Sequence, residues 1–272
     1  MTDNPLGEKT PNPGNYDPSI LYPIPRLAGR SLLNIDKSTS MYGIDHWRAY
    51  ELSWLDANGK PQVAIGEFYF NSDSDYMIES KSLKLYLNSL NQERYADAEE
   101  VRSLIENDLS NTCQSPTEVV LCSLDKTSNN WSQSRAGCCL DGNEINADAG
   151  PANPDGLELA GIPVIDEQLY SDLFKSNCPV TGQPDWASIE IRYTGEKIVE
   201  SSLLSYLCSY RNHQGYHEEC AERIFRDIMQ KCQPDELRVA MNFLRRGGLD
   251  INVYRSTLPL TSNSVNSRTI RQ

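Results

Sequence analysis

Hydrophobic residues along this chain recur with two different periods, and both periods appear in each half. A period of two is typical of a β-strand with one buried face, and a period near 3.6 is typical of a helix with one apolar stripe. The two periods place a strand, two helices and a further strand in each half, and we predict two strands, two helices and two strands per half. These elements are expected at 63–68, 83–90, 101–108 and 119–121 in the first half and at 189–193, 203–210, 220–228 and 239–243 in the second.

The two halves also share residues at a constant spacing. At an offset of 121 residues, Glu79-Ser80 aligns with Glu200-Ser201, and Tyr95 aligns with Tyr216. A repeated order of elements together with repeated residues indicates a duplicated supersecondary unit. We predict an α+β fold in which each unit has an antiparallel sheet that carries helices on one face.

Segments without a periodic apolar pattern set the expected domain boundaries. Residues 1–30 hold six of the fifteen prolines, a density that disfavours helix and favours an extended N-terminal segment. Residues 137–163 are rich in Gly, Pro, Asn and Asp, so we expect an irregular connection there. Two modules remain, an N-terminal one at 31–136 and a C-terminal one at 164–272.

Charge and cysteine usage narrow the range of partners. The 272-residue chain has a net charge of −13 and a pI near 4.7, and such a surface repels a phosphate backbone, so direct binding of nucleic acid is not expected. No apolar run is long enough to span a bilayer and the start has no signal-peptide pattern, so we expect a cytoplasmic protein with no membrane partner. The eight cysteines are then expected to be reduced thiols, and no Cys-x-x-Cys pair indicates a metal site.

Cys178 is the first candidate for chemistry. It lies seven residues ahead of Asp185 in the segment 176–186, whose prolines and glycine disfavour helix and strand. A reactive cysteine attacks as a thiolate from an irregular, partly exposed position, and a nearby carboxyl group can deliver or take a proton. The alternatives are a buried structural thiol for Cys178 and a turn cap for Asp185.

Two further segments accompany Cys178, and the three together resemble one family. Residues 79–86 are Glu-Ser-Lys-Ser-Leu-Lys-Leu-Tyr, and residues 216–223 are Tyr-His-Glu-Glu-Cys-Ala-Glu-Arg. From about His46 to Arg255 the chain resembles the long, bimodular form of the QueF nitrile reductases, which act on 7-cyano-7-deazaguanine. Tyr216 stands where members of that family often have Phe.

The resemblance implies both a reaction and a fold. The reaction is the NADPH-dependent reduction of the nitrile of a deazapurine, 7-cyano-7-deazaguanine, to 7-aminomethyl-7-deazaguanine in queuosine biosynthesis, a tRNA modification pathway. The fold is a tandem pair of duplicated tunnelling-fold (T-fold) modules. Because such modules associate through their sheets and need further partners to close a ring, a homodimer is expected.

The resemblance also assigns roles to individual residues. Cys178 and Asp185 are implied to be catalytic, the first by forming a covalent thioimide with the nitrile and the second by protonating its nitrogen. No metal is implied. The implied substrate-binding residues are Ile78, Glu79, Ser80, His217 and Glu218, and the implied NADPH-binding residues are Ser80, Lys81, Arg246 and Gly247.

The chemistry of these side chains agrees with such roles. A carboxylate such as Glu218 accepts two hydrogen bonds side by side, which suits the ring N–H and exocyclic amine of a guanine-like base. Ser80 is expected to cap a helix whose free N–H groups form an anion site with Lys81 and, one turn on, Lys84. Arg246-Gly247 suits a phosphate, whereas no Gly-x-Gly-x-x-Gly motif indicates a Rossmann site.

The repeat places the chemistry in the C-terminal module. Residues 217–218, His-Glu, align at the offset of 121 with residues 96–97, which are Ala-Asp, so the first module lacks this pair. Glu219 and Glu222 are expected to be solvated helix charges.

Three other functions remain open from the residues alone. A cysteine hydrolase or an amidinotransferase-like enzyme would use Cys178 with His217 and no reductant. A metal-dependent T-fold enzyme related to GTP cyclohydrolase would need Cys ligands near His213 and His217, and none has the right spacing. A binding module for a purine-like ligand would keep Cys178 as a structural residue.

Overall fold

The strands and helices divide into two units that interleave along the chain. The computed structural model describes residues 13–35, 39–124, 135–145, 151–265, 268–269 and 271–272. Unit 1 consists of residues 1–29, 45–129 and 245–251, and unit 2 of residues 30–44, 130–244 and 252–272.

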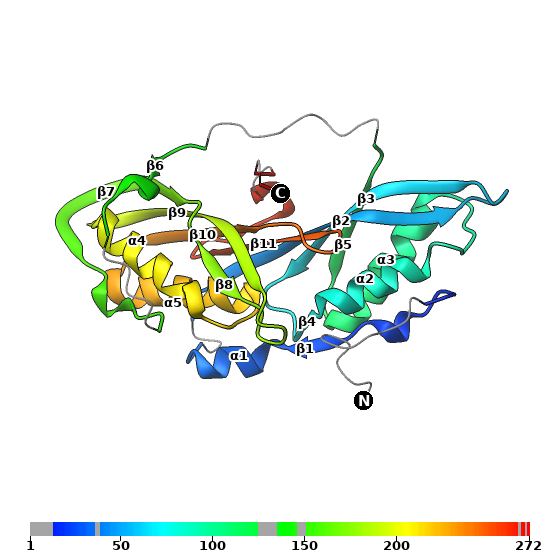
Figure 1. Ribbon diagram of the computed structural model, residues 1–272, viewed down its shortest axis with the longest axis horizontal. Coiled ribbons are helices and arrows are strands. Elements are labelled where there is room, and N and C mark those ends of the chain that lie inside the picture. The colour runs from blue at the N-terminus through cyan, green and yellow to red at the C-terminus, as the bar shows by residue number, and fades with distance from the viewer. Residues whose placement is uncertain (1–12, 36–38, 125–134, 146–150, 266–267, 270) are drawn as a thin grey trace. The chain divides into compact units, whose positions relative to one another are not determined.

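Unit 1 packs two helices against antiparallel strands (Figure 1). Strands β3 and β5 pair antiparallel, and β2 is the neighbour of β3 on its other side. Phe68 of β3 and Leu83 of α2 are fully buried, as their apolar periodicity predicts. The main elements are β2 (Tyr42–Leu55), β3 (Pro61–Asn71), α2 (Ser80–Ser89), α3 (Ala98–Cys113) and β5 (Thr117–Cys122).

Unit 2 has the same order of elements with two strands after its helices. The strand order is β11-β10-β9-β7, every neighbouring pair is antiparallel, and the short strand β8 pairs with β9. Helix α5 contacts β10, and Figure 1 shows α4 and α5 on one face of this sheet. The elements are β7 (Leu159–Ser171), β8 (Lys175–Asn177), β9 (Pro184–Ile198), α4 (Glu200–Cys208), α5 (His217–Cys232), β10 (Glu236–Phe243) and β11 (Leu249–Ser256).

These elements confirm the mixed α+β class with antiparallel sheets. Each strand and helix that the periodicity placed is present, although most are longer than the periodic segment. Among the described residues of the first half, one strand, β5, follows the helices where two were predicted. Among the described residues, no helix combines the length and the apolar character that crossing a membrane requires.

The N-terminal segment is less extended than predicted. Strand β1 (Pro23–Pro25) pairs with β4 (Tyr76–Ile78), but helix α1 (Arg26–Leu32) begins directly after Pro25. Residues 26–30 can form a helix because they contain no proline. The proline rings restrain the backbone only in the preceding residues. Residues 1–12, which are part of the predicted segment, lie outside the described residues.

The predicted connection at 137–163 contains short elements. They are β6 (Cys138–Cys139), two 3₁₀ turns at Leu140–Gly142 and Pro154–Gly156, and the first residues of β7, while 146–150 lie outside the described residues. Other 3₁₀ turns occur at Pro18–Ile20, Ser209–Asn212 and Ser262–Ser264.

A tyrosine–aspartate hydrogen bond occurs in the same place in both units. In unit 1, the hydroxyl of Tyr86 on α2 donates to Oδ2 of Asp108 on α3 at 2.6 Å. In unit 2, the hydroxyl of Tyr206 on α4 donates to Oδ2 of Asp227 on α5 at 2.7 Å. Each bond ties the two helices of its unit together.

This pair of bonds changes the predicted register of the repeat. Tyr86 corresponds to Tyr206, 120 residues on, and Asp108 corresponds to Asp227, 119 residues on. A single offset of 121 is therefore wrong for both helices, because the repeat loses one residue between them. In this register, residues 217–218 correspond to 98–99, Ala-Glu, so the first unit still lacks the histidine.

Candidate active site

Cys178 begins a tight turn between β8 and β9 in unit 2. Its backbone N–H donates to the carbonyl of Gln183 at 2.8 Å, and the N–H of Gly182 donates to the carbonyl of Cys178 at 3.0 Å. Gly182 has φ +66°, a conformation that side chains other than glycine rarely adopt. The cysteine is partly exposed in an irregular turn, as predicted, but the ends of the segment 176–186 are strands, because β8 runs to Asn177 and β9 begins at Pro184.

Asp185 lies at the start of β9, opposite Ser176 of β8 in the strand register. Its side chain is 3% exposed, and its Oδ1 lies 3.7 Å from Nε2 of His217 at the start of α5. The ring of Phe243 packs against the ring of His217 with 4.0 Å between the centroids. The fold thus brings together two residues that are 32 positions apart in sequence, Asp185 and His217.

The backbone of Asn177 links the cysteine turn to the segment that precedes α5. Its N–H donates to the carbonyl of His213 at 2.8 Å, and its carbonyl accepts from the N–H of Gly215 at 3.1 Å. Since Cys178 follows Asn177 directly and α5 begins at His217, these two bonds position the thiol relative to the first turn of that helix.

The side chains around Asn177 reinforce this link. The ammonium of Lys175 donates to Oδ1 of Asn177 and to the carbonyl of Arg211, both at 2.7 Å. The amide of Asn177 donates to the same carbonyl at 3.3 Å. Burial and the nearby Arg211 lower the pKa of Lys175. Sequence reasoning missed Lys175 and Asn177, since neither residue type signals a positioning role.

Cys220 is a structural thiol one turn into α5. It is fully buried, and burial raises its pKa to about 12. A Cβ on Gly215 would lie 2.9 Å from Nε2 of His213 and 3.4 Å from Sγ of Cys220, so the chain needs glycine there. The cysteine within the His-Glu segment is therefore not a second nucleophile.

The acidic residues near the start of α5 are buried or half-buried. Glu218 is 4% exposed in the first turn of the helix. Glu222 is also 4% exposed, and its carboxylate accepts hydrogen bonds from Arg255 at 2.9 Å and from Arg30 at 2.8 Å. The prediction that Glu222 is solvated is wrong, because α5 turns this position toward two arginines distant in sequence. Glu219 is half-buried, and burial raises its pKa.

In unit 1, Glu79 rather than Ser80 caps helix α2. The carboxylate of Glu79 accepts from the N–H groups of Lys81 at 2.8 Å and Ser82 at 2.7 Å. Burial raises the pKa of Glu79, although these two bonds act in the opposite direction. The predicted Ser80 cap is wrong, and the first-turn N–H groups expected to bind an anion already hold a carboxylate. The neighbouring Ile78 is buried at the end of β4.

Arg246 and Gly247 form a tight turn that lies against α2 within unit 1. The N–H of Arg246 donates to the carbonyl of Leu249 at 2.8 Å, and the N–H of Leu249 donates back at 3.1 Å. Gly247 and Gly248, between them, have φ +58° and +83°. A Cβ on Gly247 would lie 3.6 Å from Nζ of Lys84, so two predicted cofactor segments meet at this lysine.

Comparison with known proteins gives two family matches along the chain. Residues 12–121 match the family described as "Nitrile reductase, 7-cyano-7-deazaguanine-reductase N-term", and residues 184–259 match "QueF-like protein". The NADPH-dependent 7-cyano-7-deazaguanine reductase of Coxiella burnetii (strain CbuK_Q154) is 49% identical over 269 residues, which cover 98% of this chain and 96% of that protein. This chain belongs to the 7-cyano-7-deazaguanine reductase family. The reductase of Bordetella pertussis is 43% identical and covers 100% of this chain and 99% of its own length.

A weaker likeness exists among solved structures. The crystal structure of the archaeosine synthase QueF-Like in the apo form matches with a TM-score of 0.31 and 18% identity, over 35% of this chain and 95% of that one. Family membership therefore rests on the full-length relatives.

The family matches cover most of the candidate residues. Ile78, Glu79, Ser80 and Lys81 lie in the first matched span, and Asp185, His217, Glu218, Arg246 and Gly247 lie in the second. Cys178 lies between the two spans. Its assignment thus depends on the geometry of its turn and on its link to α5.

Proposed function

We propose that this reductase converts the nitrile of 7-cyano-7-deazaguanine to the aminomethyl group of 7-aminomethyl-7-deazaguanine, using NADPH, in the pathway to queuosine. The observation that carries the proposal is the full-length identity to reductases of that name, combined with a partly exposed cysteine in the turn that leads to the buried Asp185, which lies 3.7 Å from His217.

The covalent step needs one nucleophile and one proton. The thiolate of Cys178 adds to the nitrile carbon, the carbon–nitrogen triple bond becomes a double bond, and the nitrogen takes a proton from Asp185. The product is a thioimide. Asp185 is 3% exposed, which shields the proton transfer from bulk water, and Nε2 of His217 lies 3.7 Å from its carboxylate.

Binding of the base is assigned to buried polar groups. We assign Glu218 to the ring N–H and exocyclic amine of the deazaguanine, because a carboxylate at 4% exposure recognises paired donors with little competition from water. His217, Ile78, Glu79 and Ser80 are further proposed contacts. Each carboxylate oxygen of Glu79 accepts one N–H group of α2. Each oxygen keeps further lone pairs that can accept a hydrogen bond from a ligand.

The proposed NADPH contacts are Ser80, Lys81, Arg246 and Gly247. These residues of unit 1 suit a phosphate-bearing cofactor. Gly247 and Gly248, which follow Arg246, have no side chains, and the ammonium group of Lys84 lies beside Gly247. When bound, NADPH supplies hydride, and the reduction of a nitrile to an amine requires two such equivalents.

The tandem T-fold is part of the same proposal. We propose that 31–136 and 164–272 are duplicated modules, of which the second is catalytic, preceded by the segment 1–30 and joined by 137–163. The repeated element order and the repeated tyrosine–aspartate bond support this.

A homodimer is supported by an apolar strand edge in unit 2. Leu159, Ile162 and Ile165 of β7 are 37%, 56% and 86% exposed, and such side chains along a strand favour association. Sedimentation at the mass of a monomer would contradict it.

We further propose a cytoplasmic location, which the eight free cysteines support. We also propose that the enzyme acts on the free deazapurine and not on tRNA, because a net charge of −13 repels a phosphate backbone.

The direct test is intact-protein mass after mixing with 7-cyano-7-deazaguanine alone. We expect a gain of one ligand that is absent from Cys178→Ala, and NADPH oxidation at two equivalents per nitrile when the cofactor is added. If the protein forms no adduct and oxidises no NADPH, the hydrolase and the binding module become the preferred hypotheses.

A further inference from the structure

We propose that Gln272, assisted by Arg271, is a positioning residue for the proton-transfer step. Its side-chain amide fixes the end of β10, where Phe243 packs against His217. The proposal rests on the proposed reduction of the nitrile, and it adds two residues that lie outside both spans matched by the family.

The side chain of Gln272 is held inside unit 2 by three hydrogen bonds. Gln272 is 5% exposed. Its Nε2 donates to the carbonyl of Phe243 at 3.0 Å and to Oδ1 of Asn252 at 2.6 Å. Its Oε1 accepts from the N–H of Thr269 at 3.0 Å. A buried amide that uses both its nitrogen and its oxygen in this way has one favoured orientation.

Asn252 ties this amide to the sheet. Asn252 of β11 pairs with Asn242 of β10 in the strand register, and both residues are fully buried. The amide of Asn242 donates to Oδ1 of Asn252 at 2.8 Å and to the hydroxyl of Tyr254 at 3.3 Å. Because a buried polar group that loses its partner is costly, this network stabilises one placement of Gln272 against the two strands.

Phe243 connects this network to the candidate site. It is the last residue of β10, and its ring lies against that of His217 with 4.0 Å between the centroids. The N–H of Leu244, which comes next, donates to the carbonyl of Trp186 at 2.9 Å, directly after Asp185 in β9. A displacement of the end of β10 therefore changes the placement of both His217 and Asp185.

Arg271 ties the same stretch of chain to the segment before β8. Its Nη1 donates to the carbonyl of Asp172 at 2.7 Å. Phe174, two residues further on, packs edge-on against the ring of Phe243, with 6.2 Å between the centroids. The chain then runs through β8 to Cys178. Two neighbouring side chains thus hold the segment that leads to the thiol and the strand end that contacts the histidine.

The test measures thioimide formation from 7-cyano-7-deazaguanine, without NADPH, by stopped-flow absorbance in wild type, Gln272→Met and Gln230→Met. Methionine is unbranched and similar in length to glutamine, so Gln272→Met keeps the buried volume and loses both donated hydrogen bonds. Gln230 is exposed on α5 of the same unit, so Gln230→Met controls for the substitution itself. Urea denaturation shows whether each variant is folded.

We expect Gln272→Met to lower the rate of thioimide formation by about tenfold, because the proton donor and the histidine beside it are misplaced. The Kd of the nitrile should change by a smaller factor, and Gln230→Met should match wild type in both quantities. A general loss of structure would instead weaken binding as much as it slows the reaction, and that result would contradict a positioning role.

A double variant tests the route through Phe243. Phe243→Leu removes the ring from His217 and keeps the carbonyl that accepts from Gln272. If Gln272 acts through this ring, adding Gln272→Met to Phe243→Leu lowers the rate further by less than about twofold. Independent effects that multiply in the double variant would contradict the inference.

The wild-type rate in Gln272→Met would overturn the inference. If this variant does not fold, Arg271→Met is measured in the same way, since it breaks the bond to Asp172 and leaves the amide in place. We expect its rate to fall by about threefold, and an unchanged rate would overturn the inference. Wild type that forms no thioimide contradicts the proposed function instead, so the two failures are distinguishable.

Discussion

The hydroxyl of Tyr206 donates a hydrogen bond of 2.7 Å to the carboxylate of Asp227, and neither side chain is more than 3% exposed. The tyrosine hydroxyl also lies 2.8 Å from that of Tyr210. Because the equivalent Tyr86–Asp108 bond ties α2 to α3 in unit 1, the same polar contact joins the two helices of each unit.

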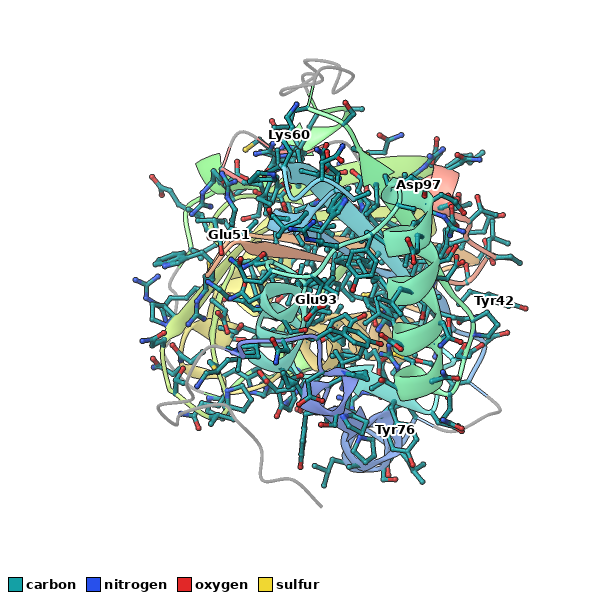
Figure 2. All side chains as sticks on the ribbon, turned by 90° about the vertical axis from the view of Figure 1, so that its right-hand side faces the viewer. Tyr42, Glu51, Lys60, Tyr76, Glu93 and Asp97 are labelled. Carbon is teal, nitrogen blue, oxygen red and sulfur yellow. The ribbon has the colours of Figure 1, made fainter. Side chains whose placement is uncertain are left out.

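Removal of this hydroxyl tests how much the contact stabilises each unit. We expect Tyr206→Phe and Tyr86→Phe each to lower the free energy of unfolding by about 1–3 kcal/mol, because a buried carboxylate loses a donor. Urea denaturation measures the change. Tyr42→Phe is the control, since Tyr42 is 42% exposed (Figure 2). Equal stability of all three variants would show that the bond is incidental.

The buried pair of Glu222 and Arg255 predicts a larger effect. Glu222→Gln removes the negative charge that contacts both Arg255, which is 0% exposed, and Arg30, and we expect a loss of about 3–5 kcal/mol in the free energy of unfolding. Glu219→Gln, on the same helix, should change it by less than about 1 kcal/mol, because burial already disfavours the charged form there. Similar effects of the two substitutions would argue against the buried ion pair.

Thiol alkylation should separate reactive from structural cysteines. Burial raises the pKa of Cys113 and Cys220 to about 12 and that of Cys232 to about 11, so these thiols stay protonated near neutral pH. We expect iodoacetamide to modify Cys178 in the native protein and to spare these three, as peptide mass spectrometry can show. The deazapurine nitrile should protect Cys178. Modification of Cys220 before Cys178 would contradict the proposed nucleophile.

The Lys175–Asn177 contact predicts a kinetic effect without a large loss of stability. In Asn177→Ala the backbone bonds to His213 and Gly215 remain, but the side-chain bond to Lys175 is lost. We expect the rate of thioimide formation to fall by about ten- to a hundredfold, because the thiol of Cys178 is misplaced. The Kd of the nitrile should change by a smaller factor. Stopped-flow absorbance measures the rate.

A matched pair of lysine variants controls this experiment. Lys175→Met removes the same contact, whereas Lys231→Met removes an ammonium group from α5 that pairs with the exposed Asp155. The first variant should slow the adduct and the second should not. If Asn177→Ala keeps the wild-type rate, the contact has no positioning role.

We expect His46 and His213 to make the folded protein less stable as the pH falls. Burial lowers the pKa of His46 and His213 below the ordinary value of 6.5. The unfolded chain then binds protons that the folded state does not, so the free energy of unfolding decreases as the pH falls through 6.5. Denaturant titrations between about pH 5.5 and 8 measure this slope. His213→Gln should make it shallower by up to about 1.4 kcal/mol per pH unit, and an unchanged slope would exclude His213.

The sequence alone predicted the parts of the fold that depend on local periodicity. Apolar residues at helical spacing in 83–90 and 220–228 correctly predicted helices, and alternating apolar residues in 63–68 and 189–193 correctly predicted strands. Both patterns arise because one face of each element must be buried. The Pro- and Gly-rich segment 176–186 likewise predicted the irregular turn at Cys178, although its two ends belong to β8 and β9. These inferences needed only the residues next to one another in the chain.

The site required contacts that local pattern does not contain. The capping role of Glu79 was assigned to its neighbour, because both residue types are compatible with a helix start and only the actual backbone shows which oxygen meets the N–H groups. Glu222 was expected in solvent, because its arginine partners lie 192 and 33 positions away in the chain.

The sequence by itself determined the mixed α+β class, the order of the elements with a clear apolar period and, through three short motifs, the family. Only the tertiary structure decided that Asn177 links the thiol turn to α5, that Lys84 lies beside Gly247 and that Tyr206 joins Asp227. The physical reason is that periodicity reports which face of an element is buried, whereas hydrogen bonds and ion pairs depend on the angstrom-scale placement of distant segments.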